Sequence, residues 1–227
     1  MRRAAIVSLT LTVVLGMISN LMFLWAAEFQ IERLIDPVRL LEGNTSAILL
    51  RWAAVTDMLS YYLPTAIVAV VLWHVLRSRS PLLTDLATLG ALAFAVAGGG
   101  AAAALAVAGS SLLEAHAAAG SDQAAIATAF AVLVEVVFRA VWQLFDTLVA
   151  GAWMIGLGML FRTDQLGFAR LSLTLGGFMW LVTVCNVLEL SLARDIALAG
   201  VFAIWAAWSI WLLLLLKSRV APFDSLA

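Results

Sequence analysis

Long apolar runs separated by short polar or basic segments recur along this chain. Six of these runs reach the length, about 20 helical residues, that crosses the hydrocarbon core of a bilayer. We expect the spans near residues 4–26, 53–76, 86–108, 139–161, 171–190 and 196–216. The pattern predicts an all-α fold, a six-span transmembrane helical bundle that forms one integral membrane domain over residues 1–227.

Two of the apolar stretches are longer than a crossing requires. Residues 123–161 contain no proline, and one helix of that length would span roughly 58 Å. The stretch from 47 to 76 is also overlong, with Ser46 placed to cap it and Pro64 placed to bend it. We therefore expect both helices to reach into a small helical extracytoplasmic cap, made from segments 28–50 and 110–138.

The first of these cap segments has its own amphipathic pattern. Ile31, Leu34 and Ile35 recur at helical spacing among charged residues, which predicts a short helix on the membrane surface. The pair Asp36-Pro37 is typical of a helix start, and Gly43 is typical of a helix end.

Composition supports a membrane protein. The chain is 64% hydrophobic and 12% charged, with a mean hydropathy of +1.06, values typical of multi-span proteins and not of soluble domains. Twelve arginines stand against one lysine among many alanines and leucines, which indicates a GC-rich bacterial genome. The single cysteine, Cys185, excludes an intrachain disulfide. No strongly basic segment suggests nucleic-acid binding.

The basic residues predict the orientation of the bundle. If the spans are numbered in order, one side collects most of them: Arg2, Arg3, Arg77, Arg79, Arg162, Arg170, Lys217 and Arg219. Positive charge favours the cytoplasmic side of a membrane. We therefore expect a bacterial inner (plasma) membrane protein with both termini in the cytoplasm.

Ionisable residues inside the fourth apolar stretch mark a candidate site. At 100° per residue, Glu135, Arg139, Trp142, Asp146 and Trp153 fall on one narrow stripe of a helix. Charge at membrane depth is costly, so such residues are a functional hypothesis by default.

A second polar face lies on the second apolar stretch. Asp57, Ser60 and Tyr61 share one side of it. If the two faces meet, Arg139 would pair with Asp57 or Asp146, and Arg51 with Glu135. The candidate residues for an ion or ligand site are Arg51, Asp57, Tyr61, Glu135, Arg139, Asp146 and Glu189.

Two interpretations of this polar cluster are open. The charges would neutralise one another and fix the register of the helices, as buried pairs often do. Alternatively, the surplus carboxylates would bind a cation, a proton or a polar solute in a cavity open to the outside.

Aromatic residues give a second candidate site. Trp205, Trp208 and Trp211 form a helical stripe in the last span. Such a stripe, together with Trp153, is typical either of core packing and lipid contact or of a pocket for a quinone, pigment or lipid. Trp153, Trp205 and Trp208 are the candidates for an apolar ligand pocket.

Catalytic signatures are weak. The two histidines, His74 and His116, are expected on opposite sides of the membrane, and no nucleophile motif occurs. We predict no catalytic residue, no metal and no cofactor, and leave a bound lipid open. An enzyme is therefore disfavoured.

Two stretches resemble a bacterial multi-pass family known as domain of unknown function 4386. The first begins at Leu50-Arg51-Trp52, passes Asp57 and ends at Val75-Leu76-Arg77. The second runs from Gly156 to Thr163 and continues through Ala169-Arg170-Leu171 to Gly176-Gly177. The family has a proline where Ala169 stands. The resemblance implies a membrane bundle of six or seven spans, with no substrate or catalytic residue.

Our first functional expectation is a non-enzymatic accessory, sensory or assembly subunit that contacts the lipid bilayer and other membrane protein subunits. The first alternative is a small transporter or channel for a proton, cation or polar solute, which would use the carboxylate and arginine cluster. The second alternative is an intramembrane enzyme acting on lipid.

Overall fold

The computed structural model describes residues 1–227 except 44, 119, 121, 219–221 and 224–227. The described residues form helices and connecting turns, with no strand. Six of the helices in this part of the chain are long and apolar enough to cross a membrane, which confirms the expected all-α, six-helix architecture. They are Arg2–Ala26, Ala47–Leu76, Pro81–Ala117, Gln123–Leu160, Leu166–Val187 and Ser191–Ser218.

Three of the six helices contain π-helical segments. The second consists of α3 (Ala47–Asp57), the π segment η2 (Met58–Tyr62) and α4 (Leu63–Leu76). The third consists of α5 (Pro81–Ala104), the π segment η3 (Leu105–Gly109) and α6 (Ser110–Ala117). The fourth consists of α7 (Gln123–Val134), the π segment η4 (Glu135–Asp146) and α8 (Thr147–Leu160). The first, fifth and sixth are α1 (Arg2–Ala26), α9 (Leu166–Val187) and α10 (Ser191–Ser218).

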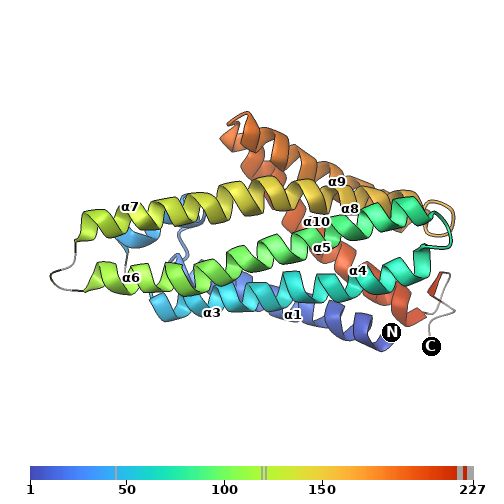
Figure 1. Ribbon diagram of the computed structural model, residues 1–227, viewed down its shortest axis with the longest axis horizontal. Coiled ribbons are helices and arrows are strands. Elements are labelled where there is room, and N and C mark those ends of the chain that lie inside the picture. The colour runs from blue at the N-terminus through green and yellow to red at the C-terminus, as the bar shows by residue number, and fades with distance from the viewer. Residues whose placement is uncertain (44, 119, 121, 219–221, 224–227) are drawn as a thin grey trace.

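The third and fourth helices lie side by side along most of the long axis of the molecule (Figure 1). The start of α1 and the end of α10 lie at one end, which we call the end nearer the termini, and α6 and α7 form the opposite end, which we call the distal end. The α9–α10 pair covers only the half nearer the termini, and the turn between these two helices stands apart from the others. The distal half is therefore built mainly from the overlong helices.

The distal extension differs in one respect from the expectation. The third helix does not end near residue 108 but continues through Ser110–Ala117, so its 37 residues span roughly 55 Å. The expected segment 110–138 is thus the distal part of two long antiparallel helices. By contrast, the 22 residues of α9 span roughly 33 Å, close to the thickness of a bilayer core.

The segment between α1 and α3 folds largely as expected. It forms the single-turn helix α2 (Ile31–Ile35) and the 3-10 helix η1 (Pro37–Glu42), and Gly43 follows as the end residue. The Ser46 hydroxyl accepts the backbone N–H of Leu49 at 3.4 Å and so caps α3. Asp36 makes no side-chain cap, contrary to its expected role.

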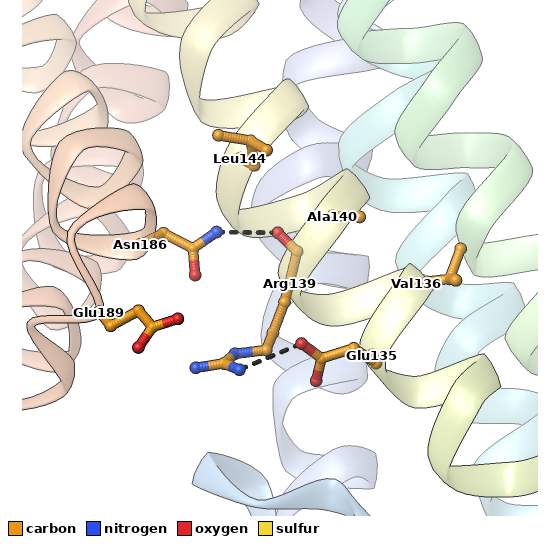
Figure 2. Close-up of a pocket in the computed structure, with 7 residues that line it drawn as sticks. All are labelled: Glu135, Val136, Arg139, Ala140, Leu144, Asn186 and Glu189. Carbon is orange, nitrogen blue, oxygen red and sulfur yellow. Dashed lines mark hydrogen bonds and ion pairs between the residues drawn. The ribbon is translucent and has the colours of Figure 1, made fainter.

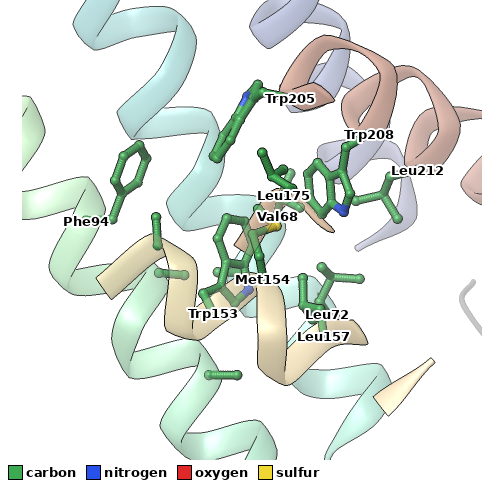
Figure 3. Close-up of a cluster of buried hydrophobic side chains, with 14 of the residues drawn as sticks. Val68, Leu72, Phe94, Trp153, Met154, Leu157, Leu175, Trp205, Trp208 and Leu212 are labelled. Carbon is green, nitrogen blue, oxygen red and sulfur yellow. The ribbon is translucent and has the colours of Figure 1, made fainter. Parts of the chain in front are cut away.

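An aromatic core fills the half of the bundle nearer the termini. Trp205 lies between Phe94 and Trp208, and Trp153 packs edge-on against Trp208 with ring centroids 5.6 Å apart (Figure 3). The Trp208 indole N–H donates to the Ser172 hydroxyl at 2.9 Å. Trp153 and Trp208 are each 1% exposed, so both are packing residues of the core.

Candidate functional site

The long π segment η4 changes which side chains share a face. A π-helix bonds residue i to i+5, so its turn is wider than the 3.6 residues of an α-helix. Glu135, Arg139 and Leu144 consequently border one depression of the surface, whereas Trp142 and Asp146 border another. The expectation of a single stripe was therefore wrong, because it assumed 100° per residue throughout.

The first depression is a shallow, charged pocket of about 270 Å³ at the α9–α10 turn. Figure 2 shows Arg139 between the carboxylates of Glu135 and Glu189. The Arg139 guanidinium donates to Glu135 Oε1 at 3.1 Å, and the Asn186 amide donates to the Arg139 carbonyl oxygen at 3.0 Å. The side chains of Arg139 and Glu135 are 45% and 61% exposed, so this is a surface ion pair.

Arg51 makes a separate contact. Its guanidinium donates to the Ser110 hydroxyl at 3.1 Å and to Glu114 Oε1 at 3.4 Å, which links α3 to α6. The expected pairs of Arg51 with Glu135, and of Arg139 with Asp57 or Asp146, do not form. Both arginines bind a glutamate at the surface, and neither neutralises the aspartates.

The second depression is a cavity of about 590 Å³ inside the bundle, which we call the central cavity. It is lined by residues of α1, α2, α3, η2, α5, η4, α8, α9 and α10. Its polar lining residues are Asn20, Asp57, Tyr61, Tyr62, Gln143, Asp146, Thr147 and Asp195. Its apolar and aromatic walls include Phe23, Leu24, Leu34, Phe94, Phe138, Trp142, Leu198, Phe202 and Trp205.

Two carboxyl groups share this cavity without a basic partner. Asp57 ends α3 and Asp146 ends η4, and the two are close enough for their charges to interact. No arginine, lysine or histidine lines the cavity among the described residues. The third carboxylate, Asp195, pairs with Arg194 at 2.9 Å.

Asp146 is the most deeply buried of these groups. It is 2% exposed, and within the described part of the chain neither of its oxygens makes a hydrogen bond of ordinary geometry. The Tyr62 side chain lies beside the Asp146 carboxyl group and is its polar neighbour. A buried polar atom without a partner costs about 1–3 kcal/mol, and more if it is charged.

Gly98 of α5 makes room for this corner of the cavity. A Cβ atom at Gly98 would overlap both the Tyr62 ring and the Asp146 carboxyl group. The Trp142 indole N–H donates to the Gly98 carbonyl oxygen at 3.4 Å. The Gly-rich run of α5 therefore serves close packing here, as small residues do between membrane helices.

Other unsatisfied polar atoms also line the central cavity. Gln143 Oε1 and Trp205 Nε1 are buried and make no hydrogen bond with the described residues. The described residues contain six buried side-chain polar atoms without a hydrogen bond. Four of them, these two and the two Asp146 oxygens, belong to residues that line the central cavity. The cavity thus offers one donor and several acceptors that its own walls do not satisfy.

The other side of the cavity is better satisfied. The Asn20 amide donates to the Tyr61 hydroxyl at 3.1 Å, and the Ser19 hydroxyl donates to the Ala53 carbonyl oxygen at 3.1 Å. The first bond holds α1 against the π segment η2, and the second holds α1 against α3. Tyr61 also packs edge-on against Trp205, with ring centroids 6.4 Å apart.

The candidate residues therefore divide into four groups. Asp57, Tyr61, Asp146 and Trp205 meet at the central cavity. Glu135, Arg139 and Glu189 border the surface pocket. Arg51 contacts α6, and Trp153 and Trp208 belong to the core.

Sequence reasoning did not select Tyr62 or Gln143. In an α-helix Tyr62 would point about 100° away from Tyr61, yet both tyrosines, which belong to the π segment η2, line the cavity. The sequence did contain one indication of Tyr62: two adjacent tyrosines follow Asp57 within the same apolar stretch.

Potential metal-ligating side chains are scattered over the described part of the chain. Within the described residues no three histidine, cysteine, aspartate or glutamate side chains gather in a metal-binding group. His74 lies near the end of α4 close to the termini, and His116 lies at the distal end in α6.

The chain matches no protein-family model, no curated protein and no solved structure. The resemblance to domain of unknown function 4386 stays a prediction. The chemistry of the central cavity is therefore the basis for a functional proposal.

Proposed function

We propose that this protein is a small membrane carrier that binds a positively charged solute on Asp57 and Asp146 of the central cavity. The observation that carries the proposal is Asp146, which is 2% exposed, makes no hydrogen bond of ordinary geometry and has no basic partner among the described residues, with the Tyr62 side chain as its polar neighbour. A structural charge at membrane depth is normally paired. This one faces a cavity of about 590 Å³.

Two carboxyl groups in one apolar cavity repel each other when both are ionised. A bound cation, or a bound proton, removes that cost. The cluster is therefore suited to cycle between a loaded and an empty state, which is what a carrier requires. A purely structural role would be better served by a paired or apolar residue.

The proposed orientation follows the distribution of basic residues. The end of the bundle that holds the termini carries Arg2, Arg77, Arg79, Arg162 and Lys217, so we place it in the cytoplasm of a bacterium. The distal end then faces outward from the inner membrane. Alkaline phosphatase fused to the C-terminus should be inactive and green fluorescent protein at the same place should fluoresce; the reverse pattern would invert the orientation.

Electrogenic cation movement tests the carrier. Full-length protein is reconstituted in proteoliposomes on a solid-supported membrane, and sodium, potassium, proton and benzyltrimethylammonium jumps are applied in turn. We expect a transient current with at least one of these cations. Asp146→Asn should lower that current at least tenfold while the protein remains folded by circular dichroism.

Glu135→Gln is the matched control, because it removes a carboxylate from the same helix but outside the cavity. It should leave the current unchanged. An absence of current with every cation, or equal currents in Asp146→Asn and the wild type, would refute the carrier.

The accessory role rests on a different observation. Only Phe130 and Val134 of the 12 residues of α7 are buried, although α7 is strongly apolar. On the proposed orientation part of this helix extends beyond the bilayer, where exposed apolar surface is typical of a protein interface. Cross-linking from a cysteine introduced at Val132, which is 60% exposed, should capture another membrane protein if this role holds; labelling by lipid alone would oppose it.

A further inference from the structure

The residues that line the central cavity indicate which kind of cation it would bind. An inorganic cation is best held by six or more oxygen ligands at short distance. The cavity instead combines two unpaired carboxyl groups with eight aromatic side chains: Phe23, Tyr61, Tyr62, Phe94, Phe138, Trp142, Phe202 and Trp205. Aromatic faces attract ammonium groups, most strongly where water is excluded.

The size of the cavity agrees with an organic occupant. Its volume of about 590 Å³ lies within the roughly 300–1,000 Å³ typical of small-molecule sites. A single water molecule takes only about 30 Å³ of liquid volume. An inorganic ion would leave most of this space to be filled by other molecules.

The polar and apolar parts of the lining are separated. Asp57, Tyr62, Gln143 and Asp146 gather where η2 and η4 meet α5. The side formed by α1, α2 and α10 is apolar apart from Asn20 and the paired Asp195. A ligand that matches both parts has a charged head and an apolar body.

The apolar side of the cavity is also its rim. Arg2 ties α1 to α10 near the termini by donating to the Leu216 carbonyl oxygen at 2.7 Å. Farther from the termini, Leu24 of α1 and Leu198 of α10 line the cavity from its two sides. Ile31 and Phe202 line it as well and are 65% and 51% exposed. Amphiphiles dissolved in the outer leaflet would meet an apolar rim there.

We propose that the solute is an organic ammonium ion with an apolar body, whose ammonium group lies between Asp57 and Asp146 and whose body packs on the aromatic wall near Trp205. This inference rests on the proposed carrier function and specifies its substrate class. The ammonium group could belong to a free lipophilic amine or to the headgroup of a lipid. The cavity chemistry is the same in both cases.

Direct binding tests the inference. Full-length protein in nanodiscs of phosphatidylglycerol is dialysed against radiolabelled benzyltrimethylammonium, with empty nanodiscs as the background. We expect one saturable site that neopentylbenzene, an uncharged compound of the same shape, does not compete for. Binding should weaken at least tenfold in Asp146→Asn and also in Trp205→Leu, and should not change in Glu135→Gln.

A second arm distinguishes the source of the ammonium group. The dialysis is repeated in nanodiscs that contain phosphatidylethanolamine. Reduced binding identifies the lipid headgroup as the occupant, and unchanged binding identifies a free amine; both results support an ammonium site.

Three outcomes overturn the inference. Competition by neopentylbenzene would show that charge is not recognised. Absence of saturable benzyltrimethylammonium binding, together with a sodium or proton current that requires Asp146, would overturn the ammonium assignment and keep the carrier. Absence of both binding and current would overturn both proposals.

Discussion

Tyr62 and Asp146, which belong to different helices, lie against the same point of α5, the Cα atom of Gly98. Gly98→Ala would place a methyl group where both side chains are, so it should displace them. We expect this overpacking to lower the free energy of unfolding by about 1–3 kcal/mol and to weaken cation binding. Unfolding in mixed micelles and benzyltrimethylammonium binding measure the two effects.

Gly100→Ala is the control for this substitution. It lies two residues away in the same helix, and its added Cβ would meet no atom within 4 Å. Because alanine stabilises a helix by roughly 0.5–1 kcal/mol relative to glycine, this variant should be at least as stable as the wild type. Equal effects of the two substitutions would contradict the close contact at Gly98.

Asp146→Leu should make the protein more stable and inactive. It replaces a buried carboxyl group that makes no hydrogen bond of ordinary geometry with the described residues by an apolar side chain of similar size, which should raise the free energy of unfolding by about 1–3 kcal/mol in the absence of cation. Ser172→Ala removes a satisfied hydroxyl and should lower it by about 1 kcal/mol. A loss of stability in Asp146→Leu would indicate that Asp146 is a structural residue.

The two tryptophans of the last helix should respond differently to phenylalanine. Trp208→Phe breaks the hydrogen bond to Ser172, whereas the Trp205 indole N–H has no partner among the described residues to lose. We expect Trp208→Phe to cost about 1 kcal/mol more stability than Trp205→Phe. Chemical unfolding of both variants measures the difference, and an equal cost would mean that Trp205 has a bonding partner in the bilayer.

The Glu135–Arg139 pair should contribute little to stability. Both side chains are largely exposed, and such i,i+4 pairs contribute about 0.3–0.5 kcal/mol. A double-mutant cycle with Glu135→Gln and Arg139→Gln measures their coupling free energy. A coupling above about 1.5 kcal/mol would indicate that the pair is shielded from water, contrary to its exposure.

The helices themselves could be read from the sequence because the length of an apolar run is set by the bilayer. Ser46, Pro37 and Gly43 were also placed correctly, since capping and turn preferences are local. The distal extension of the third helix was missed. The expected span ended at residue 108 and residues 110–117 were assigned to the cap, yet the alanines and leucines among them favour continuation of the helix.

The polar cluster was predicted only in part. The surplus of carboxylates was visible because aspartates and glutamates outnumber arginines in the spans, and Asp57 and Asp146 do share a cavity. The predicted pairing of Arg139 with Asp57 or Asp146 was wrong, because Arg139 binds Glu135, which lies one turn away on the same helix. The π segments, which decide which side chains face the cavity, could not be predicted from the apolar periodicity.

Carbodiimide labelling of Asp146 tests the central claim most directly. Dicyclohexylcarbodiimide is apolar and modifies protonated carboxyl groups at membrane depth, and peptide mass spectrometry locates the adduct. We predict modification at Asp146 that benzyltrimethylammonium suppresses in a saturable manner and neopentylbenzene does not. Absence of the adduct at both Asp146 and Asp57, or labelling that no cation suppresses, would contradict a cation site in the central cavity.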